Sequence, residues 1–444
     1  MKKNKVIRTL LSLILFGFLG KGLSMIARIL MTRELGTEAM SIYTLANPAM
    51  VLIITLAQMG LPTAIATLIS KKPEKSKKIF VSGLFISLFI SVALMIVTLL
   101  VAPYLASNVL KNEDVTMTIY GLALLIPLVS LSSLLKGYFI GHNLVKLTAI
   151  SSIAEEIMRI VFILLFLGYF SKKGPQYASF GAMMGVCVGE IFQSLYLVFQ
   201  SEKKLYRRVQ EAFDLKQIKP LEEIPGILSL SLPITLSRII SSLTYFFEPI
   251  IVTNLLMKYG VSAAKITLDY GILNGYAMPI LMLPGFFALA LANFLLPNMS
   301  AAIGKKQYSH AQKLFYTILL ASIGIGLSMA LLLEWKGNEI LHLLYKTDEG
   351  AVYVKWLALP FILYYVETPI GNAMHALGLT KKAFISTILS CMVRIVSLVL
   401  LTKHYQIRAV AISTLLAIFT NVTLNLFHVF RAFLLHNKKR AIAS

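Results

Sequence analysis

Ionisable side chains stand inside apolar stretches of this chain, where charge is costly and usually has a purpose. The stretch 147–170 carries Glu155, Glu156 and Arg159, spaced so that all three share one face of a helix. Arg159 can therefore pair with either glutamate along its own helix. Two interpretations stay open: a self-contained ion pair that only stabilises structure, or groups that take part in moving a solute.

Cations without such partners occur in two other stretches. Lys21 and Arg28 are seven residues apart and lie on the same face of the first apolar stretch. Arg238 and Glu248 share a polar face of the stretch 225–256, but ten residues separate them, about 15 Å along a helix axis, so they cannot pair within it. These inward cations predict a water-filled central site for a negatively charged substrate.

An internal repeat supplies the counterpart of Arg159. Segments 146–165 and 381–400 are identical, without gaps, at seven of twenty positions, and Arg394 lies in register with Arg159. Arg394 has no carboxylates at the matching positions of its own helix. Its partner must come from another helix, and Glu367 is the candidate.

The elements that carry these residues are long and apolar. The chain has 444 residues, 57% hydrophobic and only 14% charged, whereas soluble domains carry about a quarter charged residues. Runs of about 20 apolar residues suit a bilayer core of about 30 Å. The sequence therefore predicts an all-α, polytopic membrane protein with about twelve transmembrane helices. They lie near 8–30, 41–69, 79–102, 116–140, 147–170, 178–200, 225–256, 268–298, 313–333, 351–377, 383–402 and 408–431.

The net charge of +22 follows the loops. Alternate loops, together with both ends of the chain, hold most of the lysines and arginines, and cytoplasmic loops characteristically do so. We therefore expect a multi-pass protein of the cytoplasmic membrane with both termini in the cytoplasm. A nucleic-acid partner is not expected, because the basic residues form no single face on a soluble fold.

The repeat also predicts the arrangement of the helices. Its two copies lie six helices apart, so the halves share an orientation and should surround a central cavity. We expect an N-lobe over residues 1–200, a linker over 201–224 and a C-lobe over 225–444. The linker places Leu205, Val209, Ala212 and Phe213 on one helical face, as in an amphipathic helix on the cytoplasmic surface.

Motifs of soluble chemistry are missing from the sequence. There is no G-x-x-x-x-G-K-[ST] loop, no H-E-x-x-H, no G-x-S-x-G and no metal-spaced cluster of His and Cys. Cys187 and Cys391 are far apart in apolar blocks, where small buried hydrophobes are the more common interpretation than a disulfide or metal site. We expect neither an enzyme nor a cofactor, although an intramembrane enzyme stays possible.

Segment 27–70 resembles the opening of stage V sporulation protein B and its relatives. Arg33-Glu34-Leu35-Gly36, Tyr43 with Pro48, and Gly60-Leu61-Pro62 before a basic loop carry the likeness. Stretches 232–251, 270–300 and 375–400 also resemble this family. It is the polysaccharide-export branch of the multidrug/oligosaccharidyl-lipid/polysaccharide (MOP) exporter superfamily, which also holds the multidrug and toxin extruders and the lipid II flippase MurJ.

The resemblance implies two six-helix lobes around a cavity in which cations hold a lipid pyrophosphate. Lys21, Arg28 and Arg238 fall at comparable places and are the expected substrate-binding residues. The sporulation and lipid II members usually have two further helices that form a groove for the lipid tail. The present sequence has twelve apolar blocks, so the resemblance leaves the tail site and the exact substrate open.

Two functions from different classes follow. The first is a flippase that moves a lipid-linked oligosaccharide or peptidoglycan precursor outward by alternating access, driven by membrane potential or by an H⁺ or Na⁺ gradient. The second is a multidrug antiporter that expels organic cations, with Glu248 and Glu367 holding the cation. A major-facilitator carrier and a non-transporting scaffold are weaker alternatives. The expected partners are membrane lipids and an anionic lipid-linked substrate.

Overall fold

The protein is built from helices that run in long antiparallel passes. The computed structural model describes residues 2–142, 144–210 and 223–443, and no strand occurs among them. By its internal contacts the chain divides into two compact units, Met1–Phe246 and Phe247–Ser444. The boundary lies inside one helix, α8 (Ile224–Lys258). The predicted lobe limits stay a prediction, and residues 211–222 of the predicted linker lie outside the described part of the chain.

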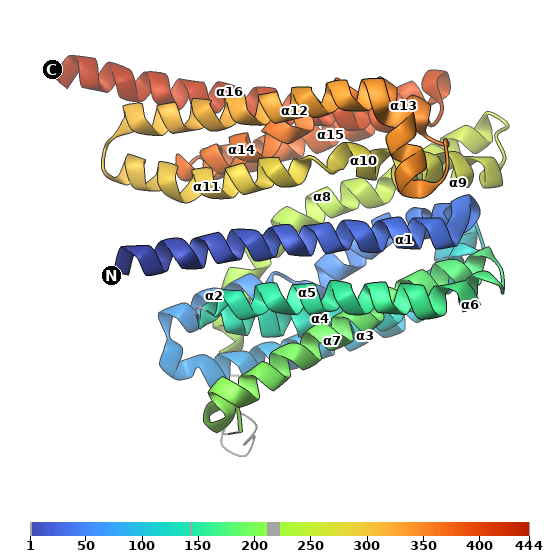
Figure 1. The fold of residues 1–444 in the computed structure, drawn as a ribbon, viewed down its shortest axis with the longest axis horizontal. Helices are drawn as coiled ribbons and strands as arrows, with labels where there is room; N and C mark the ends of the chain where they lie inside the picture. The colour runs from blue at the N-terminus through green and yellow to red at the C-terminus, as the bar shows by residue number, and fades with distance from the viewer. Residues whose placement is uncertain (1, 143, 211–222, 444) are drawn as a thin grey trace. The chain divides into compact units, whose positions relative to one another are not determined.

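Unit 1 contains the helices from α1 to the first part of α8 (Figure 1). Two π-helical turns, η2 (Leu105–Val109) and η3 (Ile163–Leu167), extend α3 and α5. The remaining elements are α1 (Lys2–Gln58), α2 (Leu61–Lys71), η1 (Pro73–Lys75), α3 (Ser76–Tyr104), α4 (Val115–Gly141), α5 (Val145–Phe162), α6 (Gly168–Ser171) and α7 (Pro175–Gln210).

Glycines set the breaks and close crossings of unit 1. Gly36 has φ 65° and ψ −178°, a conformation that only glycine adopts readily, and it kinks α1 into two passes. A second break at Gly60, with φ 61°, separates α1 from α2. Farther along, α4 passes so close to α2 that a Cβ on Gly137 would stand 2.5 Å from the carbonyl oxygen of Pro62. Small residues at such crossings are typical of helices packed in a membrane.

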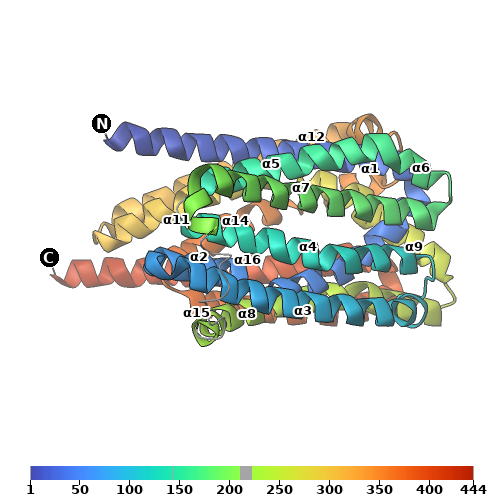
Figure 2. The same ribbon diagram turned by 90° about the horizontal axis from the view of Figure 1, so that it is seen from below.

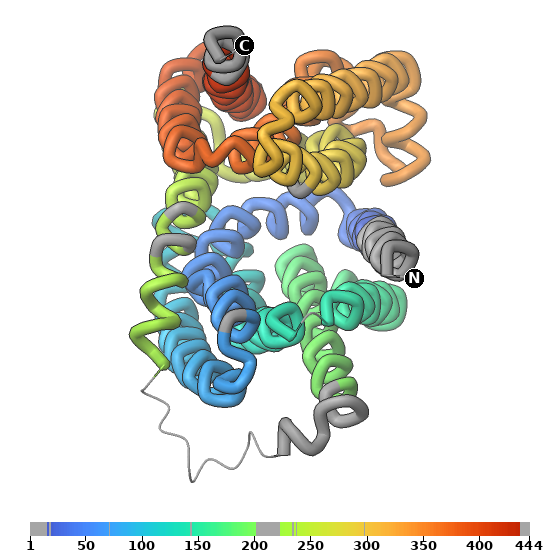
Figure 3. Tube along the Cα trace, turned by 90° about the vertical axis from the view of Figure 1, so that its left-hand side faces the viewer, coloured from blue at the N-terminus to red at the C-terminus, as the bar shows by residue number. Residues whose placement is uncertain are grey.

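Unit 2 continues with shorter elements and then long ones (Figure 2). The π-helical segment η5 (Ile272–Ala277) joins α9 to α10, and these two short helices lead into α11. The bounds are α9 (Ala263–Gly271), α10 (Met278–Met282), α11 (Gly285–Gly304), α12 (Tyr308–Tyr345), α13 (Ala351–Ala358), α14 (Ile362–Ala376), α15 (Thr380–Tyr405) and α16 (Arg408–Ala443). Within each unit the long helices run roughly parallel or antiparallel, as the end-on view shows (Figure 3).

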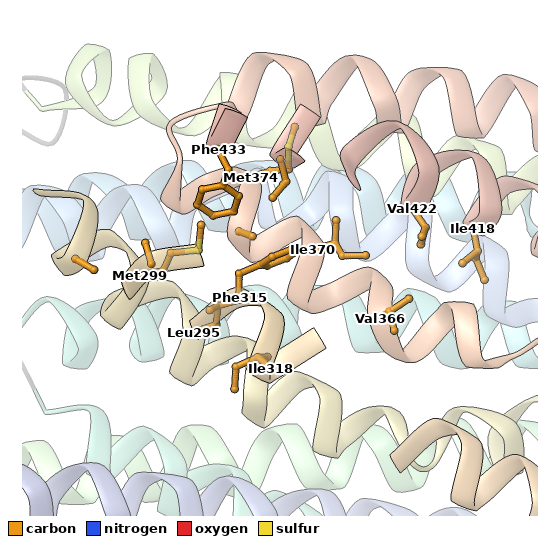
Figure 4. Close-up of a cluster of buried hydrophobic side chains, with 14 residues drawn as sticks. Leu295, Met299, Phe315, Ile318, Val366, Ile370, Met374, Ile418, Val422 and Phe433 are labelled. Carbon is orange, nitrogen blue, oxygen red and sulfur yellow. The ribbon is translucent and has the colours of Figure 1, made fainter. Parts of the chain in front are cut away.

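Each unit has an apolar core of its own. In unit 1, residues of α2, α3 and α4 pack with Leu197 of α7 and Ile227 of α8. In unit 2, side chains of α11, α12, α14 and α16 interdigitate around Phe315 and Ile370 (Figure 4). Because lipid tails are as apolar as these side chains, close van der Waals packing between the helices, and not removal of apolar area from water, holds such cores together in a membrane.

Large apolar side chains also cover the outside of the helices. Leu100, Leu165, Leu320 and Leu400 are each at least 66% exposed, on α3, η3, α12 and α15. Nine helices among the described residues are long and apolar enough to cross a membrane, and the first, Leu19–Ser70, covers two of the predicted passes. In their described parts the predicted intervals are mainly helical, but turns at 59–60, 283–284 and 359–361 interrupt three of them. The protein is therefore a multi-pass membrane protein, as expected, with about twelve passes.

Candidate functional site

The charged face of α5 is the centre of a buried polar cluster in unit 1. Arg159 Nη2 lies 2.7 Å from Glu155 Oε1, and Arg159 Nη1 lies 3.0 Å from Glu156 Oε2. The side chains of both glutamates are 12% exposed and that of Arg159 is 18% exposed. The predicted pairing along one helix is confirmed, and the guanidinium bridges both carboxylates at once.

Helices α4 and α7 add groups that sequence reasoning missed. Gln193 of α7 donates from Nε2 to Glu155 Oε2 at 2.6 Å, and Lys136 Nζ of α4 lies 4.0 Å from the same oxygen. The hydroxyl of Ser132 donates to the buried Glu190 carboxylate. Lys136 lies inside α4 and is half-buried.

A local signal for these residues does exist in the sequence. Ser132 and Lys136 are four residues apart, and Glu190 and Gln193 are three apart, so each pair shares a helical face within an apolar run. Neither pair combines opposite charges on one helix, so neither draws attention by itself. The cluster becomes visible only when α4, α5 and α7 pack together, which the internal contacts of unit 1 show.

Helix α1 supplies the fourth side of the cluster. It packs against α4, α5 and α7, and the Ser24 hydroxyl forms a hydrogen bond with Glu156. The charge of Lys21, one turn before Ser24, also acts on the Glu156 carboxylate. One turn after Ser24, Arg28 lies within electrostatic range of the Tyr43 phenol, as does Arg159. The two expected α1 cations are thus carried by a helix that packs against α5, with the charge of Lys21 acting on Glu156 of α5 and that of Arg28 on Tyr43 of α1. Their role in binding a substrate stays a prediction.

The charges of this cluster nearly balance. Four cationic side chains (Lys21, Arg28, Lys136 and Arg159) stand with three carboxylates (Glu155, Glu156 and Glu190). Ionised groups away from water persist only when they are paired and hydrogen-bonded. The excess positive charge lies on α1, so an incoming anion would gain the most electrostatic attraction there.

Arg238, the third expected substrate-binding residue, occupies a different place. It is exposed on α8, and its carbonyl accepts a hydrogen bond from Ser242, whose hydroxyl lies 3.0 Å from that of Thr55 on α1. Among the described residues, no hydrogen bond or ion pair joins the Arg238 side chain to the α5 cluster. Its part in a shared site stays a prediction.

In unit 2, Arg394 pairs with a residue other than the one expected. The guanidinium of Arg394 on α15 binds Glu248 Oε2 on α8, and the Tyr270 hydroxyl on α9 donates to Glu248 Oε1 at 3.1 Å. The expectation that Glu367 would be the ion-pair partner is wrong. Glu248 meets Arg394 because the last part of α8 and helix α15 belong to the same unit, and their separation of 146 positions along the chain hid the contact from sequence reasoning.

Glu367 on α14 has amide partners instead. Asn421 of α16 donates from Nδ2 to Glu367 Oε1 at 2.7 Å, and Asn425 donates to Asn421 Oδ1 at 2.9 Å. The charge of Arg394 reaches Glu367 without forming an ion pair with it. In the described part of the chain, Glu367 is thus a membrane-embedded carboxylate held mainly by neutral donors, and no group of three or more His, Cys, Asp or Glu forms a metal site.

Comparisons with known proteins agree with this architecture. The sequence model of the family described as "Polysaccharide biosynthesis protein" matches residues 6–303, and the model described as "MatE" matches residues 233–400. Stage V sporulation protein B of Bacillus subtilis is 30% identical over 89% of this chain and 77% of the relative. The lipid II flippase MurJ of the same organism is 23% identical, covering 93% of this chain and 80% of the relative.

Solved structures show the same fold. A multidrug resistance MATE family transporter of the MOP superfamily, in an inward-facing conformation, superimposes with a TM-score of 0.78 at 17% identity, over 94% of this chain and 96% of the other. The lipid II flippase MurJ in an inward closed conformation gives a TM-score of 0.70 at 18% identity, over 97% and 90%. The fold and its buried charges therefore define a helical transporter of the MOP superfamily. Within it, the chain belongs to the polysaccharide biosynthesis protein family.

Proposed function

We propose that this protein is a flippase that moves a lipid-linked oligosaccharide or a peptidoglycan precursor, a lipid pyrophosphate, to the outer leaflet. The observation that carries the proposal is the polar face of α1 with Lys21, Ser24 and Arg28, on a helix that packs against α5 and whose Lys21 and Ser24 act on Glu156. Cations on membrane-spanning helices would attract a phosphate head through charge-assisted hydrogen bonds. The name of the lipid II flippase relative and the description of the matching family as a polysaccharide biosynthesis protein support this substrate class.

Membrane potential supplies the outward drive in this proposal. With both termini in the cytoplasm, the substrate enters from the inside-negative face. Moving one negative charge outward across 100 mV releases about 2.3 kcal/mol. A head with two negative charges is therefore exported readily, and the return of the empty carrier is the step that needs a coupling ion.

Glu367 is the proposed site of that ion, H⁺ or Na⁺. Its carboxylate is held by Asn421, a neutral donor, whereas both oxygens of Glu248 are already engaged by Arg394 and Tyr270. A carboxylate without an ion-pair partner at membrane depth gains more from a proton or a small cation than one that is already paired.

The test is binding of a lipid pyrophosphate to the purified full-length chain. Saturable binding should weaken about tenfold or more in Lys21→Ala and in Arg28→Ala, since each removes a charge-assisted contact. The exposed Lys172→Ala is the matched control and should bind as the wild type does. Equal affinity in all four proteins would sink the proposed anion site. A loss in Arg238→Ala as well would place Arg238 with the α1 cations.

A multidrug antiporter remains the second candidate, favoured by the match of the MatE model to residues 233–400. In that case an organic cation, and not the lipid pyrophosphate, should bind. Its binding should fall in Glu367→Gln and persist in Lys21→Ala. Cation transport into proteoliposomes, measured with each variant, separates the two functions.

Membrane potential gives an independent test of the drive. In proteoliposomes with no pH or Na⁺ gradient, flipping of a fluorescent lipid pyrophosphate should accelerate when a potassium diffusion potential makes the entry side negative. If the rate ignores the potential at fixed ion gradients, the electrical drive is wrong, even if the substrate is right.

A further inference from the structure

The guanidinium of Arg394 stands among groups from three other helices of unit 2. It binds Glu248 of α8 directly, beside Tyr270 of α9, and its charge reaches Glu367 of α14. Glu248 has a side chain that is only 1% exposed, whereas that of Arg394 is 21% exposed. The long arginine side chain thus carries a positive charge from a partly open position to a carboxylate that no solvent reaches.

Both oxygens of the Glu248 carboxylate are used. Tyr270 donates to Oε1 and Arg394 to Oε2. A carboxylate buried in this way needs either a cation or a proton, because the cost of desolvating its charge is several kcal/mol. Among the described residues, Arg394 is the only cationic group shown in an ion pair with Glu248. Its guanidinium does what a bound monovalent metal ion would do at the same place.

Unit 1 shows how different the matching position is. Arg159 is held by Glu155 and Glu156 of its own helix, and Glu155 also has Lys136 and Gln193 beside it. Loss of Arg159 would therefore leave a cation and an amide near the Glu155 carboxylate. Loss of Arg394 would leave Glu248 with the Tyr270 phenol as its hydrogen-bond partner among the described residues. Of the two repeat arginines, only Arg394 would leave a vacant cation site behind.

We propose that Arg394 is a tethered counter-ion that fills a monovalent-cation site built from Glu248 and Tyr270, with Glu367 nearby. The native protein binds no separate cation at Glu248. Removal of the guanidinium uncovers a site that takes guanidinium or Na⁺ from solution. This inference concerns unit 2 alone and does not rest on the identity of the transported substrate.

The experiment is chemical rescue of stability. Thermal unfolding of the detergent-purified full chain is followed in a buffer whose only cation is tetramethylammonium, a bulky organic cation without N–H donors. Guanidinium chloride, far below denaturing concentrations, or NaCl is then titrated in. Arg394→Ala should unfold at a lower temperature than wild type, and either ion should raise its midpoint saturably by about 2 °C or more. Neither ion should shift the unfolding midpoint of the wild type through the Glu248 site, because Arg394 already occupies it.

Matched variants separate a cation site from a merely structural ion pair. Glu248→Gln/Arg394→Ala lacks the buried charge, so it should unfold at a higher temperature than Arg394→Ala and show no rescue. Arg394→Lys keeps a tethered cation and should need no added ion. The exposed Arg238→Ala should behave as the wild type does.

Several outcomes overturn the proposal. The first is an Arg394→Ala protein whose unfolding midpoint neither ion raises. The second is an ion-induced rise in the midpoint of the double variant equal to that of Arg394→Ala. The third is a rise in the wild-type midpoint with Na⁺ that Glu248→Gln abolishes. If Arg394→Ala does not fold, folding of the double variant supports the proposal, and failure of both overturns it.

Discussion

Arg159 shows how a positive charge is kept at membrane depth. Its two carboxylates come from the preceding turn of the same helix, at 2.7 and 3.0 Å, so the pairing needs no other element. Such spacing is readable in a sequence, and the pairing was predicted from it. Glu190 and Lys136 were not, because their partners Ser132 and Glu155 lie on other helices. At the scale of residues, contacts within a helix can be predicted and contacts between helices cannot.

Removing Arg159 should destabilise unit 1. Arg159→Ala leaves Glu155 and Glu156 without their shared guanidinium, and breaking a buried pair costs about 3–5 kcal/mol. We expect about 2–3 kcal/mol here, since the groups are partly exposed and Lys136 stays near Glu155. The midpoint temperature of thermal unfolding should fall by several degrees.

A second substitution checks the cause of that loss. Arg159→Ala/Glu156→Gln removes one of the stranded charges and should recover part of the lost stability. The exposed Arg238→Ala serves as the control. If Arg159→Ala unfolds no earlier than Arg238→Ala, the ion pairs of α5 contribute nothing measurable.

At the scale of elements, glycine decides how closely helices pass. The backbone of α4 at Gly137 leaves no room for a side chain against Pro62 of α2, and Gly189 of α7 lies similarly against Glu155 of α5. The second crossing holds the α7 polar groups against the α5 cluster, so the packing of small residues and the geometry of the site are linked. The sequence contains these glycines, but only the structure shows which backbone each one faces.

Gly137→Ala should be destabilising for this reason. Its Cβ would stand 2.5 Å from Pro62 O and 2.8 Å from Pro62 Cα, so two backbones must separate, at a cost of about 1–3 kcal/mol. Gly371→Ala in α14 has open space around its Cβ and should be neutral or slightly stabilising, because alanine favours helix.

Thermal unfolding of these two variants separates close packing from helix propensity. The glycine-to-alanine change should shift the unfolding midpoint in opposite directions at the two positions, or shift it in Gly137→Ala alone. Equal shifts would mean that helix propensity and not the α2–α4 crossing controls the result.

At the scale of the whole molecule, the long apolar blocks were enough to predict the class of fold. The predicted passes are mainly helical in their described parts, although turns, π-helical segments and the short helices α6, α9, α10 and α13 divide several of them. Two of the turns contain a proline, Pro284 and Pro360, whereas the π-helical segments have no comparable mark in the sequence. The charge asymmetry of the loops predicts the orientation of the chain in the membrane.

Orientation can be tested by cysteine labelling in intact cells. In a background without Cys187 and Cys391, Asp348→Cys in the α12–α13 connection should react with a membrane-impermeant maleimide from outside. Glu74→Cys in η1 should react only after the membrane is permeabilised. Both positions are exposed, so access to solvent is not limiting. The reverse pattern would place the termini outside and exclude outward export as described.

The two ways of holding the repeat arginines also bear on how the chain is made. Helix α5 carries its arginine and both carboxylates on one segment, so their charges are already paired when the helix enters the bilayer. Helix α15 carries an arginine whose partner was synthesised 146 residues earlier, and a lone arginine at the centre of an inserting helix costs about 2.5 kcal/mol or more. Biogenesis of unit 2 therefore depends on the insertion of α8 into the membrane before that of α15.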